Sequence, residues 1–247
     1  MDKKMKIYAL LILAFCVSGC KTGQKKTTQR RPEKRQDNQL TDAEKKAGWI
    51  LLFDGKTTQG WKNYRRNTIS KKWVAVDGTL KHLGRGRDIV TEKAFSNFIF
   101  QIDWKIGKDT NSGIFYRVTE NKSNPWETGP EYQILDNHSK KYKSDAAKAT
   151  NIAGANYGLY KSIRSATKPL GQWNHTVIVA KGNKIEHWLN GKKVVAYTIN
   201  SADWKKRIAR SKFRAWKDYG LQKKGHFCLQ DHGDVVSFKN IKVLELK

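Results

Sequence analysis

Residues 73–82 read WVAVDGTLKH, and they give the most direct indication of the fold. Two short runs of strand-forming residues flank Asp77-Gly78, a dipeptide that tolerates the positive φ angles of a tight hairpin turn. A second such dipeptide, Asn190-Gly191, lies between two similar runs later in the chain. The two hairpins predict neighbouring antiparallel strands in both halves of the sequence.

The rest of the chain beyond residue 48 carries the same kind of signal. Further candidate strands are residues 49–53, 98–105, 113–118, 131–135, 175–180, 184–189, 193–198, 225–229 and 235–243. These runs are short, and turn residues separate them. About a dozen such strands in one region of about 200 residues predict an all-β fold, a two-sheet antiparallel sandwich.

Only two helices are expected, and both are short. Thr41-Asp42-Ala43-Glu44 has the form of a capping box, so a helix should span about 41–47. Ser201 can cap a second helix that reaches about residue 209. Neither a repeat nor a linker interrupts residues 41–247, which we therefore expect to form a single domain.

The N-terminus indicates export. Residues 1–20, MDKKMKIYALLILAFCVSGC, combine a basic start, a short apolar stretch and an ending that resembles a bacterial lipobox. We expect residues 1–19 to be a signal peptide, Cys20 to be lipidated, and residues 20–40 to be a flexible basic tether. The protein would then be anchored to a bacterial membrane, on the periplasmic face or the cell surface. Cys228 would be the only other cysteine left, so no intramolecular disulfide is expected.

The chain is strongly basic, with 49 Lys and Arg against 22 Asp and Glu, a net charge of +27. Such a charge first suggests nucleic acid, but an exported lipoprotein meets little of it, so no nucleic-acid partner is expected. The charge is also uneven. Residues 205–224 hold nine basic residues against one acidic, whereas residues 120–136 hold four acidic residues against one basic.

Polar residues on the predicted strands are the candidates for chemistry, because the sequence holds no G-x-S-x-G, C-x-x-C, H-E-x-x-H or Walker-type motif. Alternation along 131–135 places Glu131 and Gln133 on the face opposite the apolar residues. The same reasoning places Gln230 and His232 outward, and Arg117 follows Gly113 and Phe115 on its own strand. If these side chains converge, they form an acid/base and oxyanion set. Otherwise each is a solvated strand residue.

Six short pieces of the sequence, in order, resemble the 3-keto-disaccharide hydrolase family over about residues 48–247. They are Gly48-Trp49 with Leu52-Phe53-Asp54-Gly55 and Gly60-Trp61; Asn111-Ser112-Gly113-Ile114 with Arg117; Glu131-Tyr132-Gln133-Ile134-Leu135-Asp136; Gly171-Gln172-Trp173-Asn174; Trp188-Leu189-Asn190-Gly191; and Leu229-Gln230-Asp231-His232-Gly233 with Phe238-Lys239-Asn240-Ile241. Lys239 departs from the pattern, where Arg is expected. The resemblance implies a concanavalin A-like jelly roll and cleavage of glycosides already oxidised to a ketone at C3.

The resemblance also suggests roles for the candidate residues. A ketone at C3 acidifies the proton on C2, so the site needs a base near C2 and an electrophile near the C3 oxygen. Either His232 or Glu131 would be the base, and Arg117 would stabilise the enolate. The hydroxyl groups and rings of the sugar would contact a wider set: Gln133, Asp136, Tyr157, Trp188, Asn190 and Gln230.

Three questions stay open on the sequence alone. A divalent cation is a candidate cofactor, with Asp54 and the acidic segment 120–136 as candidate ligands, but no ligand spacing is diagnostic. The same sandwich could be a non-catalytic carbohydrate-binding module. The basic segment 205–224 could instead bind an anionic glycan. It contains Phe213 and Trp216 and directly follows Trp204.

Overall fold

A computed structural model describes residues 36–247. The predicted signal peptide, the lipidation site at Cys20 and most of the predicted tether lie outside the described residues. Within residues 36–247, no helix is both long enough and apolar enough to span a membrane.

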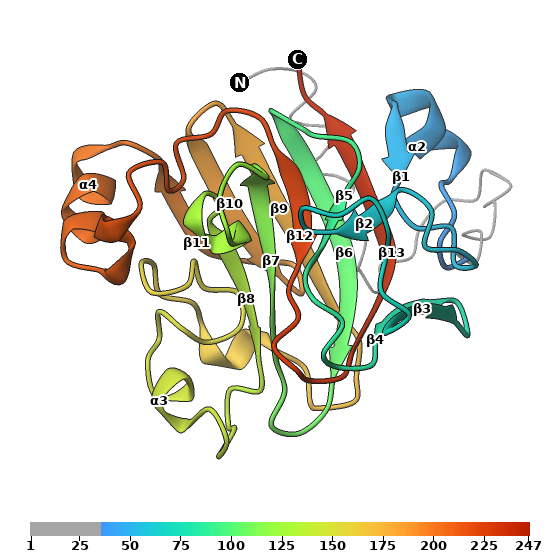
Figure 1. Ribbon diagram of the computed structural model, residues 1–247, viewed down its shortest axis with the longest axis horizontal. Coiled ribbons are helices and arrows are strands. Elements are labelled where there is room, and N and C mark those ends of the chain that lie inside the picture. Colours follow the sequence, from blue (N-terminus) through green and yellow to red (C-terminus); the bar gives the residue numbers. More distant parts are fainter. Residues whose placement is uncertain (1–35) are drawn as a thin grey trace, which may run out of the picture. The chain divides into compact units, whose positions relative to one another are not determined.

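Thirteen strands form two antiparallel sheets within this part of the chain (Figure 1). The larger sheet has the order β11 (Lys192–Thr198), β10 (Lys184–Leu189), β9 (Asn174–Lys181), β6 (Phe98–Ile106), β13 (Val236–Glu245), β4 (Thr79–His82) and β3 (Trp73–Val76), and β1 (Trp49–Leu51) also pairs with β13. The smaller sheet has the order β2 (Trp61–Asn63), β5 (Ile89–Thr91), β12 (His226–Leu229), β7 (Asn111–Val118) and β8 (Glu131–Leu135). The expected all-β, two-sheet jelly-roll sandwich is confirmed; the sequence patterns had not predicted β2 and β5.

Both predicted hairpin turns are present. Asp77 and Gly78 have φ angles of 49° and 68° and join β3 to β4. Asn190 and Gly191 have φ angles of 50° and 81° and join β10 to β11. Two consecutive positive φ angles give the turn the twist that matches paired strands, which is why these dipeptides fix the register of each hairpin.

The two predicted helices also form. In α2 (Asp42–Ala47), Thr41 and Glu44 make the reciprocal hydrogen bonds of a capping box, and Gly48 ends the helix with a φ of 86°. In α4 (Ala202–Ala209), the Ser201 hydroxyl accepts from the backbone N–H of Trp204. A third helix and three 3₁₀ turns were not predicted: α3 (Lys143–Ala146), η1 (Pro125–Glu127), η2 (Arg164–Ala166) and η3 (Lys212–Ala215).

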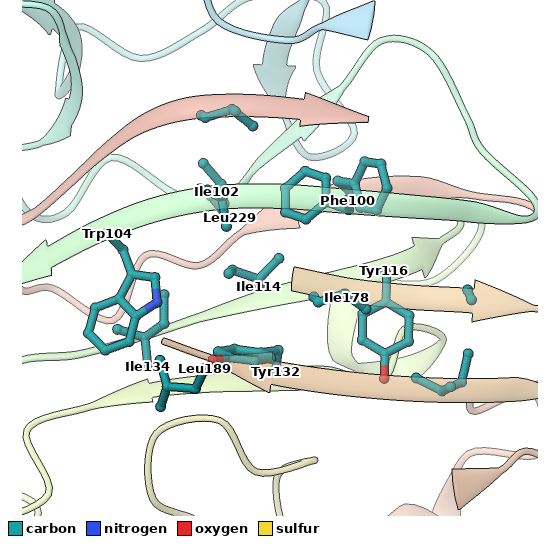
Figure 2. Close-up of a cluster of buried hydrophobic side chains, with 14 of the residues drawn as sticks. Phe100, Ile102, Trp104, Ile114, Tyr116, Tyr132, Ile134, Ile178, Leu189 and Leu229 are labelled. Atoms are coloured by element: carbon teal, nitrogen blue, oxygen red, sulfur yellow. The ribbon is translucent and has the colours of Figure 1, made fainter. Parts of the chain in front are cut away.

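The core lies between the two sheets and consists of their facing apolar side chains. Figure 2 shows Phe100, Ile102 and Trp104 of the larger sheet packed against Tyr116 and Tyr132 of the smaller one. All five side chains are buried. Burying a large side chain of this kind contributes about 1.5–3 kcal/mol, so this layer holds the sheets together and fixes which strand faces point outward.

The folded unit begins before residue 41, where the sequence analysis had placed its start. Asn38 is buried, and its backbone N–H donates to Asn240 Oδ1 at 2.7 Å. The Asn38 amide also donates to the backbone carbonyl of Gly78 at 2.8 Å. Residue 38 is therefore part of the sandwich rather than of a flexible tether.

Candidate functional site

Strand β8 presents two polar side chains on the face that points away from the core. Tyr132 and Ile134 belong to the core, so alternation turns Glu131 and Gln133 outward, as predicted. Gly113 on the neighbouring strand β7 makes room for the carboxyl group. A Cβ at that position would lie 2.2 Å from Glu131 Oε1, so only glycine allows Glu131 this conformation.

Strand β12 brings a second group of polar residues to the same face. Phe227 and Leu229 pack into the core, whereas Cys228 is buried on the outer face with Phe115. The chain continues beyond the strand with Gln230 and His232. The backbone N–H of Gln230 donates to the carbonyl of Gly113 at 2.9 Å. Gln230 is thereby held beside Gly113 of the adjacent strand β7, over which the Glu131 carboxyl group lies.

Two long connections rise above this face and convert it into a cavity. The first, residues 136–173, carries α3 and pairs with the free edge of β8. Gln133 N donates to the Ala155 carbonyl at 3.1 Å, and Gly154 N donates to the Gln133 carbonyl at 2.9 Å. The second, residues 199–225, carries α4 and η3. In Figure 1 both α3 and α4 lie on the β8 side of the smaller sheet.

Stacked aromatic rings fix the second connection in place. Trp204 of α4 stacks on Tyr197 of β11 with ring centres 5.3 Å apart, and on Tyr219 at 5.9 Å. Tyr219 in turn stacks on Phe213 of η3 at 4.1 Å. The stack runs from the core to the cavity wall, so it holds Lys212, the residue before Phe213, at the rim.

The cavity has a volume of about 440 Å³, which is within the usual size of a small-molecule site. Five of the predicted site residues line it: Glu131, Gln133, Tyr157, Gln230 and His232. The other lining residues are Asn111, Phe115, Trp126, Gly129, Asp145, Lys212, Phe213, Tyr219 and Asp231. Aromatic walls and a floor of polar groups are the composition that sugar sites require, since sugar rings stack on aromatic faces.

Several polar atoms of the cavity lining are buried and make no hydrogen bond. They are Gln133 Oε1, Gln230 Oε1 and the Tyr219 hydroxyl. Buried polar atoms are satisfied in most proteins, and an unsatisfied one costs about 1–3 kcal/mol. Three such atoms around one cavity indicate a ligand or water molecules with several hydrogen-bonding groups.

Glu131 is the acid of the cavity whose pKa is strongly raised. Its residue is 7% exposed, and no hydrogen bond to its carboxyl group is found among residues 36–247. Burial raises its pKa to about 8; the ammonium of Lys212 opposes this change, and the carboxylates of Asp88 and Asp145 add to it. At neutral pH Glu131 is therefore mainly a neutral acid that can donate a proton.

His232 is held by a relay of two further side chains. Tyr142 donates its only hydroxyl proton to Asp234 Oδ2 at 2.7 Å, and its oxygen lies 3.2 Å from His232 Nδ1. Since the tyrosine proton is already used, His232 must donate from Nδ1. This assignment leaves Nε2 with its lone pair, and His232 is exposed at the cavity. The arrangement suits a general base.

Lys212 supplies positive charge to the cavity. Its ammonium lies 4.6 Å from the centre of the Tyr157 ring. The Tyr157 hydroxyl donates to Asp145 Oδ1 at 3.1 Å, which ties the ring to the opposite wall. Sequence reasoning had included Lys212 only in the basic segment 205–224, although its position next to Phe213 was a usable signal.

The prediction that Arg117 faces the groove is contradicted by a β-bulge. His226 pairs with Val118 but Cys228 pairs with Phe115, so β7 carries an extra residue, and Arg117 has a φ of 55°. The bulge reverses the alternation. The Arg117 side chain is buried elsewhere and donates to the carbonyls of Ser96, at 2.9 Å, and Gly182, at 2.8 Å.

Asp136 and Asn190 also lie outside the cavity lining, because both hold turns together. Asp136 is buried and accepts from the backbone N–H groups of Asp109 and His138, each at 3.0 Å. The Asn190 amide donates to the carbonyl of Ala166 at 2.8 Å, at the hairpin between β10 and β11. Their place in recognisable motifs reflects structure rather than contact with this cavity.

Trp188 is likewise remote from the cavity. It lies on β10 of the larger sheet, between the core residues His187 and Leu189, so its side chain points away from the sandwich interior. Its indole N–H donates to Glu186 Oε2 at 2.9 Å, and the ammonium of Lys193 lies 5.3 Å from its ring. It cannot contact a ligand in the cavity described above.

Two of the candidate metal ligands, Asp54 and Glu120, are engaged in local structure. Asp54 accepts from the backbone N–H groups of Lys56 and Thr57 in a turn, and Glu120 of the acidic segment pairs with Lys62 at 2.7 Å. Over residues 36–247, three or more His, Cys, Asp or Glu side chains nowhere group in a way that could hold a metal ion.

Comparison with known proteins agrees with this architecture. A crystal structure from Parabacteroides distasonis, described as a candidate glycosyl hydrolase, has 39% identity and a TM-score of 0.81, covering 86% of this chain and 100% of that one. A second from the same species has 28% identity and a TM-score of 0.62, covering 80% and 99%. A 3-keto-disaccharide hydrolase of Bacteroides thetaiotaomicron is 31% identical over 226 residues, 79% of this chain and 78% of that protein. The model of the 3-keto-alpha-glucoside-1,2-lyase-like domain matches residues 48–244, and the chain therefore belongs to that family.

Proposed function

We propose that this enzyme cleaves glycosides or disaccharides whose sugar carries a ketone at C3, with net hydrolysis of the glycosidic bond. The observation that carries the proposal is the pairing of a neutral acid, Glu131, with a base, His232, in one cavity lined by unsatisfied polar atoms. The family and the curated relative support a glycoside hydrolase. The mechanism below is inferred from the residues.

In the first step His232 Nε2 removes the proton from C2 of the keto-sugar. The electron pair of the C2–H bond forms a C2=C3 double bond, and the C3 oxygen takes the proton of Glu131 or a strong hydrogen bond from it. The acidity of the C2 proton comes from the ketone, so one base and one acid suffice. Each role contributes about 10²–10⁴ in rate.

In the second step the C3 carbonyl re-forms and any proton on its oxygen returns to Glu131, the C1–O bond breaks, and the departing oxygen takes the proton that His232 removed from C2. The product is an unsaturated ketone with a C1=C2 double bond. Water adds to C1 and a proton returns to C2, which completes hydrolysis. The family name refers to a 1,2-lyase and the relative to a hydrolase. Both names fit these reaction steps: a lyase stops before the addition of water, and a hydrolase completes it.

The remaining cavity residues bind and orient the substrate. The ammonium of Lys212 supplies positive charge for the enolate, the role that the sequence analysis had given to Arg117. The amide oxygens of Gln133 and Gln230 can accept from sugar hydroxyls. The aromatic rings of Trp126 and Tyr157 offer faces on which a sugar ring can stack.

The test is product analysis with a 3-keto-disaccharide and with the same disaccharide before oxidation. We expect cleavage of the ketone alone. Glu131→Gln and His232→Ala should each lower the rate by about 10²–10⁴, whereas Glu120→Gln, a matched carboxylate outside the cavity, should not. Rates like wild type in both cavity variants, or equal cleavage of the unoxidised disaccharide, would refute the proposal.

Membrane anchoring through Cys20 is a separate proposal and rests on the sequence of residues 1–20 alone. Labelling of the cells with a fatty-acid analogue should mark the wild-type protein and not Cys20→Ala. Equal labelling of both proteins would contradict a lipid anchor at this cysteine.

A further inference from the structure

A second cavity, of about 420 Å³, lies on the outer face of the larger sheet. Trp104 and Phe238 point into the core from strands β6 and β13, so their neighbours Lys105 and Ser237 point away from it. The catalytic cavity lies on the outer face of the other sheet. The two cavities are therefore on opposite sides of the sandwich.

Strand register explains why this face is hollow. Ser237 pairs with Lys81 on one side and with Lys105 on the other, so a small residue separates two long side chains. The β3–β4 hairpin turn, which includes Asp77, forms one wall, and Trp173 forms part of another. The result is a recess with a small polar floor and an aromatic side wall.

Ammonium groups crowd around the recess. Those of Lys105 and Lys239 lie 4.9 Å and 4.6 Å from the centre of the Trp173 ring. Lys239 also pairs with Asp37 at 2.6 Å. Lys105 and Lys81 have no acidic partner among residues 36–247. Lys81 and Lys105 flank Ser237 on the two sides of β13, and an anion bound between their ammonium groups would attract both of them.

We propose that this recess is a secondary binding site for an acidic sugar, one that carries a carboxylate or sulfate group. The indole of Trp173 would contact the sugar ring, and the ammonium groups of Lys81 and Lys105 would hold the anion. A flat anionic membrane fits less well, because the recess is concave. This site would hold an acidic glycan on the side of the enzyme opposite the cavity where cleavage is proposed.

The proposal can be tested by calorimetric titration of the full chain with tri-galacturonate, with a sulfated chondroitin disaccharide, and with neutral maltotriose. We expect an acidic probe to bind and maltotriose not to bind. Lys105→Gln should weaken binding about tenfold, the loss that about 1.4 kcal/mol represents. Trp173→Ala should weaken it as well. Lys184→Gln, which removes an exposed lysine of β10 outside the recess, is the matched control and should bind like wild type.

Thermal unfolding of each variant shows whether it is folded. If Trp173→Ala does not fold, Lys105→Gln, which changes a residue on the sheet surface, still tests the proposal. Four results would overturn the proposal: binding of neither acidic probe, equally tight binding of maltotriose, binding like wild type in Lys105→Gln, or equal loss of binding in Lys184→Gln. The measurement needs no turnover, so its outcome is independent of whether 3-keto-sugars are the substrate.

Discussion

Replacement of Glu131 by glutamine should make the protein more stable at neutral pH. Burial raises the pKa of this carboxyl from 4.5 to about 8. Between these values the carboxyl binds a proton in the folded state and releases it in the unfolded state. The stability that the neutral form provides is therefore complete below pH 4.5 and is lost progressively as the pH rises to about 8. A glutamine side chain does not titrate.

The size of the effect follows from the same two values. Between pH 4.5 and pH 7 the wild type loses about 3 kcal/mol of stability, at about 1.36 kcal/mol per pH unit. Glu131→Gln should thus raise the free energy of unfolding by about 3 kcal/mol at pH 7 and hardly at all at pH 4.5. Activity should fall at the same time, because a buried acid is kept for function at a cost in stability.

Urea unfolding of both proteins at pH 4.5, 7 and 8.5 measures this difference. Glu120→Gln is the control with the opposite sign. The pKa of Glu120 is lowered, despite partial burial, by its ion pair with Lys62 and its hydrogen bond from Arg65 N–H, so its replacement should destabilise the protein at pH 7. An equal change of stability in Glu131→Gln at pH 4.5 and pH 7, or no gain at pH 7, would refute the assignment of Glu131 as a buried neutral acid.

Four further substitutions test the site and its supports. His232→Ala should lower kcat by about 10²–10⁴, whereas Tyr142→Phe, which removes the hydroxyl between His232 and Asp234, should cause a smaller loss of kcat; a kcat like wild type in Tyr142→Phe would contradict the relay. Gly113→Ala places a Cβ 2.2 Å from Glu131 Oε1, so both activity and stability should drop, by about 1–3 kcal/mol for stability in urea unfolding; wild-type values would show that the carboxyl group lies elsewhere. Arg117→Met removes the hydrogen bonds that this buried side chain donates to the carbonyls of Ser96 and Gly182, and it should lower stability by about 1–3 kcal/mol, while KM measured on folded protein stays unchanged; a raised KM with normal stability would return Arg117 to the site.

The fold was predictable because its signals are local. A tight hairpin turn requires two consecutive positive φ angles, which Asp-Gly and Asn-Gly tolerate better than most dipeptides. The structure has hairpins at both Asp77-Gly78 and Asn190-Gly191. Alternation of two residues determines which side chains of β8 face the core, so Glu131 and Gln133 were placed correctly on the outer face.

The candidate site was only partly predictable, because alternation fails wherever a strand is irregular. The extra residue in β7 turns Arg117 to the opposite side, and the sequence around it gives no sign of the bulge, since an arginine rarely adopts a φ of 55°. The exposure of the outer face was also misjudged. Gln133 is 1% exposed because the long connections cover the sheet.

Residues in the long connections could not be predicted as part of the site, since nothing local links them to β8 and β12. Asp145 and Lys212 reach the cavity through the packing of α3 and η3. Tyr142 and Asp234 meet at His232 although they are separated by 92 residues in the sequence. Such contacts depend on the complete fold rather than on any pattern of neighbouring residues.

The central claim is that cleavage begins with removal of the C2 proton by His232. The most direct measurement is cleavage of a 3-keto-disaccharide in D₂O, with the released 3-keto-sugar analysed by NMR and mass spectrometry and corrected for the exchange of that sugar incubated without enzyme. Removal of the C2 proton followed by addition of water predicts deuterium at C2 of the product. Complete retention of hydrogen at C2 would show that the C1–O bond breaks directly and would contradict the mechanism.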